Sequence, residues 1–481
     1  MQPENQLTQP HRVFSNRTLN FRALKAIGYD MDYTLIDYQT EMVESLIFAH
    51  ALEGFQAMGW PVEGLRFSTD TVARGLVIDL ELGNTVKANR FGFIKKAAHG
   101  TRLLEFEEQR AIYAREIVDI EEPRWVFLNT LFSLSEGSIY SQLVDLLDKG
   151  FLPRQMGYVE LYKKVRDMVD AQHADGRMKP EIMRDPSRYL AIYPDTPLAL
   201  LDQFYAGKKL FLVTNSDWTY TSAMMAIAFD PYLPDGMRWR DLFSLVIVDA
   251  RKPDFFTTLN PFFHIESNDG LLRAAKGQPE PGNAYVGGCA ALVEKTFGVS
   301  GDEILYVGDH LFTDVHITKS VLRWRTALII KEIEDDIAAL DSFAPTEISL
   351  AAKMAEKEAI ESQLAQARIS IQRLKKGYGP APTQSKQKLE AQTQALRNRL
   401  LAIDDEIAPL AIASTELANP RWGLLTRAGN EKSLLAEQVE RYADIYTSRM
   451  SNLGRLTPFA FVRSPRGSAP HDAAALSAVR E

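Results

Sequence analysis

Four short apolar segments along the chain predict buried strands, and each one ends at a group of polar residues. The first covers residues 26–29 and is followed at once by an Asp-Met-Asp run at residues 30–32. The others cover residues 210–213, 246–248 and 304–307. Apolar runs of this length are typical of strands buried on both faces of a parallel sheet. Helical patterns between them predict an α/β fold with a Rossmann-like core, in which helices flank a parallel sheet.

The same patterning divides the chain into regions. Residues 1–20 are predicted to form a polar leader, and residues 21–50 and 186–345 the core. Within the core, glycine and proline breaks predict an extended loop or hairpin over residues 260–288. Residues 51–185 are a large insertion, with short antiparallel strands followed by mostly helical periodicity. An insertion directly after the first motif is expected to be a cap domain that closes over the site and selects the substrate.

A helical hairpin is predicted over residues 346–412, where two segments repeat apolar residues at a spacing of four and three. The hairpin either packs on itself and on the body or makes an oligomeric or regulatory contact. Residues 413–463 are predicted to pack on the core as a C-terminal helical segment, with an amphipathic helix over residues 431–452. Residues 464–481 are expected to form a loose tail.

Composition and charge narrow the function classes. The chain has 481 residues, enough for two or three domains, and its 46% hydrophobic content is ample for a core. The net charge of −8 gives no overall basic footprint, so no nucleic-acid partner is expected. The single cysteine leaves no intrachain disulfide, which fits a reducing compartment. Without an apolar leader or a run of ~18 apolar residues, we expect a cytoplasmic protein that makes no membrane contact.

The first polar group places two carboxylates where phosphoryl transfer would use them. Asp30 and Asp32 lie two positions apart at a strand end, and the strand period of two aims both side chains the same way. Two such carboxylates are costly at the end of a buried strand unless a cation and a phosphate use them. One can attack phosphorus, the other can transfer a proton, and a metal cancels the charge. Surface turns also produce this spacing, so it is weak evidence alone.

The other three strand ends supply the remaining parts of a phosphate site. The end of the second strand carries small donors suited to phosphate oxygens, at Thr214, Asn215 and Ser216. Lys252 follows the third strand as a point charge, and Asp309 and Asp314 follow the fourth as hard oxygen ligands for a metal. Each group has an ordinary alternative, namely a helix N-cap, a solvated lysine or a plain turn. Together they are expected to converge, because ligands of open α/β sheets bind outside the carboxyl ends of the strands.

This order of motifs resembles the haloacid-dehalogenase superfamily of phosphotransferases. The resemblance implies that Asp30 is the nucleophile and Asp32 the general acid/base. It implies that Lys252 steadies a phosphoaspartate, while Thr214 and Asn215 hold phosphate and Ser216 beside them contacts the substrate. The same resemblance implies a Mg²⁺ cofactor whose ligands are Asp30, the backbone carbonyl of Asp32, and Asp309. Asp314 would then support Asp309 or Lys252 from behind.

One helix of the insertion carries polar residues on a single face. Arg166, Asp170 and His173 are spaced by four and three residues, and Lys179 follows the helix. This face could read a heteroaromatic base, with the basic groups donating hydrogen bonds and Asp170 accepting one, while Phe132 stacks on the ring. The ordinary alternatives are a solvent-facing ion pair between Arg166 and Asp170, and a core phenylalanine.

With these residues the chain resembles the cytosolic purine 5′-nucleotidase family, which prefers IMP and GMP. The resemblance covers nearly the whole chain, including the runs 30–35, 128–132, 166–173, 214–217, 249–253, 308–312 and 441–444. It implies that a 6-oxopurine base is held by Phe132, Arg166, Asp170, His173 and Lys179. It also implies Mg²⁺-dependent hydrolysis of purine nucleoside 5′-monophosphates, phosphate transfer to nucleosides, and homo-oligomers, either dimers or tetramers.

Two other functions are compatible with the sequence. One is a phosphatase of the same superfamily that acts on another small phosphorylated substrate. The other is a non-catalytic binding protein that keeps the fold and uses the helical hairpin to contact a partner. Decayed enzymes usually lose the nucleophile or the lysine, and here Asp30, Asp32, Lys252 and Asp309 are all present, which favours an enzyme.

Overall fold

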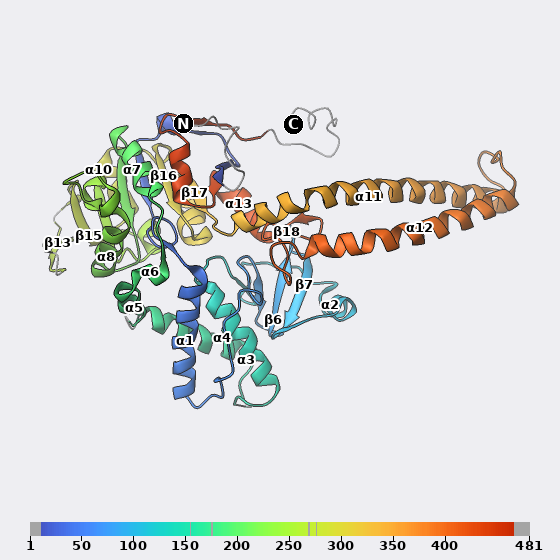
Figure 1. Ribbon diagram of the computed structural model, residues 1–481, viewed down its shortest axis with the longest axis horizontal. Helices are drawn as coiled ribbons and strands as arrows, with labels where there is room; N and C mark the ends of the chain where they lie inside the picture. Colours follow the sequence, from blue (N-terminus) through green and yellow to red (C-terminus); the bar gives the residue numbers. More distant parts are fainter. Residues whose placement is uncertain (1–10, 154, 175–176, 268–269, 276, 466–481) are drawn as a thin grey trace.

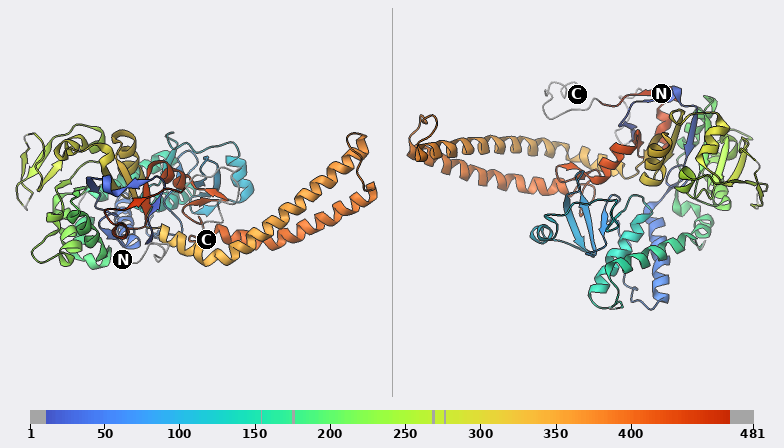
Figure 2. Two further views of the ribbon diagram at one scale, coloured as in Figure 1. Left: turned by 90° about the horizontal axis from the view of Figure 1, so that it is seen from above. Right: turned by 180° about the vertical axis from the view of Figure 1, so that it is seen from behind.

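The computed structural model consists of a core, a cap and a long helical arm (Figure 1). Seen from above and from behind, the arm extends away from both other parts (Figure 2). The described residues are 11–153, 155–174, 177–267, 270–275 and 277–465, with residues 173–174 described by their backbone alone. Half of the predicted leader, residues 1–10, and nearly all of the predicted tail, residues 466–481, lie outside the described residues.

A ten-stranded sheet forms the core, in the order β1-β20-β17-β16-β3-β11-β12-β15-β13-β14. The strands from β20 to β15 in this order run parallel, and β1, β13 and β14 pair antiparallel at the two edges. The parallel strands are β3 (Ala26–Tyr29), β11 (Lys209–Val213), β12 (Leu245–Val248), β15 (Asn283–Gly287), β16 (Ile304–Gly308), β17 (Arg325–Ile329) and β20 (Ile445–Thr447). The edge strands are β1 (Phe14–Ser15), β13 (Phe262–Ile265) and β14 (Leu272–Ala274). The predicted α/β class with a parallel sheet is confirmed.

Helices and short turns connect the strands of the core. The helices are α7 (Asp195–Tyr205), α8 (Trp218–Phe229), α9 (Asp254–Thr257), α10 (Ala290–Phe297) and α13 (Leu434–Tyr442). Two π-helical segments follow β16, at Leu311–His316 and Thr318–Leu322. Turns of 3₁₀ helix lie at Phe21–Ala23, Asp230–Tyr232, Trp239–Leu242, Gly301–Glu303 and Met450–Arg455. Two small antiparallel pairs complete this part, β2 (Leu19–Asn20) with β21 (Phe461–Val462) and β18 (Arg427–Ala428) with β19 (Glu431–Lys432).

Burial explains why the central strands form at the apolar runs of the sequence. Every residue of β3, β12 and β16 is buried. Gly28 in β3 leaves no room for a side chain, because a Cβ atom there would lie 2.3 Å from the Phe211 ring. β3 lies between β11 and β16, with Tyr29 opposite both Leu212 and Val307. The polar residues that follow these strands therefore meet at one edge of the sheet.

The cap combines a five-stranded antiparallel sheet with helices that pack beside the core. Its strands are β5 (Val77–Asp79), β6 (Asn84–Ala88), β7 (Ile94–His99), β8 (Arg102–Leu103) and β9 (Trp125–Phe127). Its helices are α1 (Thr40–Ala57), α2 (Phe106–Tyr113), α3 (Ser133–Asp148), α4 (Tyr158–Ala174), α5 (Met178–Arg184) and α6 (Pro186–Tyr189). Helix α1 packs on α3 and α4 (Figure 1), so the chain passes from core to cap within this helix. The pairing of β4 (Asp37–Tyr38) with β10 (Leu190–Ala191) brings it back to the core.

Two sequence predictions about the core are wrong in part. Residues 260–288 do contain the hairpin of β13 and β14, but their last residues form β15, an inner strand of the main sheet. The helix predicted over residues 431–452 is confined to α13, after which the chain enters β20. The reason is a tertiary contact: the buried Asp444 carboxylate accepts hydrogen bonds from Lys319, Arg325 and the Thr326 backbone, which docks this segment on β17.

The arm is an antiparallel pair of helices, α11 (Ile333–Lys376) and α12 (Lys386–Thr415). Apolar residues at the predicted spacing are buried between the two helices, including Ile360, Leu364, Ile403 and Ile407. Helix α11 begins 13 residues before the predicted boundary of 346, because it continues directly from the end of β17. No helix in the described ranges is both long enough and apolar enough to cross a membrane.

Asp444→Asn is expected to lower the free energy of unfolding by about 3 kcal/mol at pH 7, because it leaves Lys319 and Arg325 without their buried partner. Burial alone would raise the pKa of Asp444, but hydrogen bonds from Arg325 and Lys319 outweigh it and hold this pKa below its ordinary value. The stabilisation is therefore present above the unfolded-state pKa of ~3.9 and is lost as the pH falls through the lower folded pKa. Urea unfolding at pH 7 and below pH 4 measures both effects.

The matched control is Asp341→Asn, which removes an exposed carboxylate in the arm. We expect its unfolding free energy to stay within about 0.5 kcal/mol of the wild type. Equal effects of the two substitutions would contradict the role given to Asp444.

Candidate active site

The ends of β3, β11, β12 and β16 line one side of a cavity of about 580 Å³, and cap helices line the other side. From the core, the predicted residues in its wall are Asp30, Asp32, Asn215, Ser216, Lys252, Asp309 and Asp314. From the cap they are Phe132, Arg166, Asp170 and Lys179. Thr214 is fully buried behind this wall. The side chain of His173 lies outside the described residues, although its backbone belongs to α4.

Lys252 stands at the centre of the core side, between two carboxylates. Its Nζ atom lies 2.8 Å from Asp30 Oδ1 and 2.8 Å from Asp314 Oδ1. The lysine side chain is only 3% exposed, so the ion pairs are nearly free of solvent screening. Burial lowers the pKa of Lys252, but Asp30 and Asp314 outweigh it and hold the pKa well above its ordinary value. Lys252 is therefore a permanent positive charge beside Asp30.

Three carboxylates share this small volume, and one lysine does not neutralise them. Ligand atoms of Asp30, Asp309 and Asp314 lie within 4.8 Å of one another. Burial raises the pKa of Asp30 to about 7, against the opposing effect of Lys252, and burial with the Asp30 charge raises that of Asp309 well above its ordinary value. A cation among them would stabilise the ionised forms, and hard oxygen donors suit Mg²⁺.

Asp314 differs from the other two carboxylates because both of its oxygens already have partners. Its Oδ1 accepts a hydrogen bond from Lys252 Nζ, and its Oδ2 accepts one from the His310 backbone N–H at 3.2 Å. This arrangement favours Asp30 and Asp309 as the metal ligands. Asp314 then fixes Lys252 in place, which agrees with its predicted supporting position.

Asp32 is held by two hydroxyl groups. Its Oδ1 accepts a hydrogen bond from the Tyr38 hydroxyl, and its Oδ2 accepts one from the Ser216 hydroxyl at 2.8 Å. Burial, with the neighbouring Asp30 charge, raises the pKa of Asp32 above its ordinary value. A carboxyl group that keeps its proton more readily than usual is suited to act as a general acid. Tyr38 lies beyond the first motif, and the sequence reading did not identify it.

The second strand end supports other site residues through its own hydrogen bonds. Asn215 clamps the backbone of Lys252, since its Oδ1 accepts from the Lys252 N–H at 2.6 Å and its Nδ2 donates to the Lys252 carbonyl at 3.2 Å. Thr214 Oγ1 accepts from the Ser216 N–H at 3.0 Å. Asp217 caps α8 by accepting from the Tyr220 N–H. The N-cap alternative given for Thr214, Asn215 and Ser216 is therefore wrong, because Asp217 is the N-cap of α8, and Asn215 and Ser216 line the cavity.

The predicted base-reading residues in the cap wall differ in how strongly they already interact with other side chains. Arg166 Nε and Asp170 Oδ2 are 3.8 Å apart, and their side chains are 58% and 68% exposed. The Phe132 ring packs edge-on against Tyr33, with ring centroids 4.8 Å apart. Lys179 Nζ already has a partner in Asp217 Oδ2, at 2.9 Å. Arg166 and Asp170 therefore have the most freedom to contact a ligand.

Three more residues were not predicted as site residues, namely Glu136 and Thr130 in the cavity wall and Arg74 beside it. Glu136 accepts a hydrogen bond from the Tyr162 hydroxyl, and burial raises its pKa. Arg74 donates from Nη2 to the Asp309 backbone carbonyl at 2.6 Å, which fastens the cap to a core strand end. Thr130 donates to Asp309 Oδ2 at 3.4 Å. Only Thr130 had a sequence signal, since it lies within the run 128–132.

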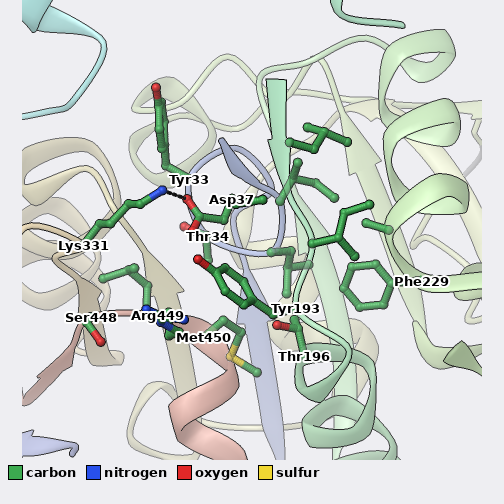
Figure 3. A pocket seen from close by; sticks show the side chains of 17 residues that line it. Tyr33, Thr34, Asp37, Tyr193, Thr196, Phe229, Lys331, Ser448, Arg449 and Met450 are labelled. Atoms are coloured by element: carbon green, nitrogen blue, oxygen red, sulfur yellow. Dashed lines mark hydrogen bonds and ion pairs between the residues drawn. The ribbon is translucent and has the colours of Figure 1, made fainter. Parts of the chain in front are cut away.

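A second, much smaller cavity lies behind the loop that carries Asp30 and Asp32 (Figure 3). Its volume of about 20 Å³ is that of a single water rather than of a substrate. At its edge Lys331 Nζ lies 2.7 Å from Asp37 Oδ1 and donates to the Tyr38 carbonyl at 2.7 Å. These contacts tie the loop after β3 to the end of β17 and so hold the carboxylates in position.

The chain is similar in sequence to known proteins over most of its length. The family model described as the 5′ nucleotidase family matches residues 13–474. A 5′-nucleotidase domain-containing protein of Dictyostelium discoideum is 27% identical over 476 residues, which is 96% of this chain and 75% of the relative. Similar solved structures include one described as a predicted phosphoglycolate phosphatase from Haemophilus somnus 129PT. It is 14% identical, with 64% of this chain and 85% of that chain covered and a TM-score of 0.29. A HAD-superfamily hydrolase from Geobacter sulfurreducens PCA is also 14% identical, with 64% and 87% covered and a TM-score of 0.26.

Asp309→Asn is expected to weaken Mg²⁺ binding by at least about 100-fold, because it removes a hard anionic ligand. Asp314→Asn is expected to weaken it by only about 10-fold, because Asp314 acts through Lys252 and not on the metal itself. Isothermal titration calorimetry of each folded variant with Mg²⁺ measures the difference. Equal losses in the two variants would contradict the assignment of Asp314 as a supporting residue.

Proposed function

The chain belongs to the 5′ nucleotidase family and is a hydrolase of that class, and on this premise we propose how it acts. We propose that it hydrolyses purine nucleoside 5′-monophosphates, with IMP and GMP preferred, in a Mg²⁺-dependent reaction through a phosphoaspartate. The observation that carries the proposal is the pairing of Asp30 with Lys252 beside the hydroxyl-bound Asp32, in a cavity enclosed by core and cap.

In the first step a carboxylate oxygen of Asp30 attacks the phosphorus of the 5′-phosphate. Oδ1 of Asp30 already accepts a hydrogen bond from the Met31 N–H at 2.7 Å and forms the ion pair with Lys252 Nζ. This leaves Oδ2 as the attacking oxygen. The bond between phosphorus and the 5′-oxygen breaks, and protonated Asp32 gives its proton to that oxygen. The nucleoside leaves, and the phosphoryl group stays on Asp30, with Lys252 offsetting its charge.

In the second step Asp32, now a carboxylate, takes a proton from water. The water oxygen attacks phosphorus, and the bond between phosphorus and Asp30 breaks. Phosphate leaves, Asp30 returns as a carboxylate, and Asp32 holds the proton needed for the next cycle. A nucleoside 5′-hydroxyl in place of water would give transfer instead of hydrolysis, by the same exchange of bonds.

The residues that would hold Mg²⁺ are Asp30, Asp309 and the backbone carbonyl of Asp32. Their oxygen donors fit a hard cation, and the raised pKa values of Asp30 and Asp309 indicate a site that needs more positive charge than Lys252 supplies. When bound, the cation would offset negative charge on the carboxylates and the phosphate oxygens.

Recognition of the base is assigned to the cap wall. Arg166 donates and Asp170 accepts, which matches the C6 carbonyl and the protonated N1 of a 6-oxopurine. Adenine reverses this pattern, so AMP would leave the Arg166 donor and the Asp170 acceptor without matching partners and be disfavoured. Phe132 would stack on the ring, while Lys179, paired with Asp217, would act nearer the phosphate side. His173 stays a prediction from the resemblance.

Two further expectations remain proposals. The cytoplasmic location rests on the reducing conditions suggested by the single cysteine. The homo-oligomeric state rests on the family resemblance. A different small phosphorylated substrate remains the alternative within the same chemistry.

Asp30→Asn is expected to lower phosphate release from IMP and GMP by at least about 1,000-fold, because the amide is not a nucleophile. EDTA is expected to abolish release by the wild type, and added Mg²⁺ to restore it. The assay compares IMP, GMP, AMP, UMP and a sugar phosphate, with circular dichroism to show that the variant is folded. Unchanged release by Asp30→Asn would refute the phosphoaspartate route, and equal release across the panel would refute base selection.

Asp170→Asn is expected to reduce the ratio of kcat/KM for IMP over AMP by roughly 10- to 100-fold, because the amide offers a donor where the 6-oxopurine needs an acceptor. Hydrolysis of a sugar phosphate should not change. Asp167→Asn is the matched control, since Asp167 is exposed on the same helix but does not line the cavity. A similar change in both variants would contradict the role given to Asp170.

A further inference from the structure

The charges of the α11–α12 arm are sorted by position. Its outer part, residues 362–399, contains eight basic side chains and one acidic side chain. Its inner part, residues 333–361 and 400–416, contains twelve acidic and two basic side chains. The chain as a whole has a net charge of −8. The arm therefore has a strongly basic end and a strongly acidic base, in one projecting rod (Figure 1).

Many of these charges have no counter-charge within the arm. The cross-helix pairs join Lys353 to Glu406, Lys357 to Asp404, and Arg399 to Glu356. Among the described residues, no carboxylate lies within ion-pair distance of six outer cations, Arg368, Arg373, Lys375, Lys376, Lys388 and Arg397. Likewise, no described cation pairs with five inner carboxylates, Asp341, Glu347, Glu358, Glu361 and Asp405. The two ends of the arm therefore carry uncompensated charge of opposite sign.

We propose that the arms of two copies of this chain pair side by side and antiparallel, so that the outer part of each lies along the inner part of the other. A two-fold axis near the boundary of the two parts places unpaired cations against unpaired carboxylates twice over. Parallel pairing would place like charges together. A polyanion would suit the outer part but would be repelled by the inner part, so it explains only half of the arrangement.

Exposed apolar side chains at both ends of the arm support the same pairing. In the inner part Ile348 is 72% exposed, and in the outer part Leu374 is 40% and Tyr378 45% exposed. Antiparallel pairing brings the apolar groups of one end to those of the other. Helix α11 has 44 residues, and a helix rises by 1.5 Å per residue. With the axis at the boundary of the two parts, residues 347–376 of this helix overlap with those of the other copy. A face about 45 Å long and about 10 Å wide would then bury about 900 Å² in total, which is the size of a weak, transient interface.

Charge reversal tests the pairing in the full-length protein. The outer variant carries Arg368→Glu, Lys375→Glu and Lys376→Glu, and the inner variant carries Glu347→Lys, Glu358→Lys and Glu361→Lys. We expect the wild type to associate, and we expect added salt to weaken this association. In each variant alone, we expect the dissociation constant to be at least about 10-fold larger than in the wild type. An equimolar mixture of the two variants should associate again, because the reversed charges are complementary. Analytical ultracentrifugation measures all three.

Three reversals at exposed cations outside the arm serve as the matched control, Arg110→Glu, Lys149→Glu and Lys295→Glu. This control should associate like the wild type. All variants should keep hydrolytic activity, since none of these residues lines the active-site cavity, and retained activity shows that they are folded.

Cross-linking tests the orientation. Ser385→Cys lies in the outer part and Ser349→Cys in the inner part, both at exposed serines, and the native Cys289 is buried. A short bismaleimide should join the two variants in a mixture but should not join Ser385→Cys to itself. Links only between outer parts, a monomer at low salt, or association that ignores the charge reversals would each overturn the proposal. A monomer that binds heparin through the outer cations would assign the arm to a polyanion instead.

Discussion

The ion pairs of Lys252 with Asp30 and Asp314 are the interaction on which the active site depends. The lysine comes from the end of β12, and the carboxylates follow β3 and β16, so the contact joins three strand ends. All three groups are buried, and their Coulomb interaction is therefore much stronger than that of a surface pair. Without the lysine charge, burial would favour the protonated form of Asp30, which cannot attack phosphorus. Lys252 thus favours the ionised form of Asp30, although burial still raises the pKa of this carboxyl to about 7.

Polar contacts join the cap to the core at the edge of the sheet where the strand ends meet. Arg74 and Thr130 of the cap donate hydrogen bonds to Asp309 of the core. The helix face with Arg166 and Asp170 and the strand ends with Asp30 and Lys252 then lie on opposite walls of one cavity. The distance between these two walls therefore depends on the contacts that join the two domains. A substitution in either domain can therefore alter both selectivity and chemistry.

The arm differs from the core and the cap in its packing, because only a narrow seam between its two helices is buried. Ile360, Leu364, Ile403 and Ile407 join its helices, while charged and polar residues cover the rest. The Asp336 carboxylate accepts from the Leu425 and Thr426 backbone N–H groups and anchors the root. An extended polar rod of this kind adds little to the stability of the core, so its charge pattern is free to serve contacts with other molecules.

The sequence by itself determined the parallel sheet, the four polar strand ends and the spacing of the helical hairpin, because buried strands and coiled-coil seams leave local apolar patterns. It also determined which strand ends carry acids and which carries the lysine. Only the tertiary structure decided that Asn215 clamps the Lys252 backbone, that Arg74 and Tyr38 hold the acidic residues, and that residues 445–447 form a strand and not a helix. These outcomes depend on partners up to hundreds of residues away, such as Arg74 and Asp309, and no local pattern encodes such a contact.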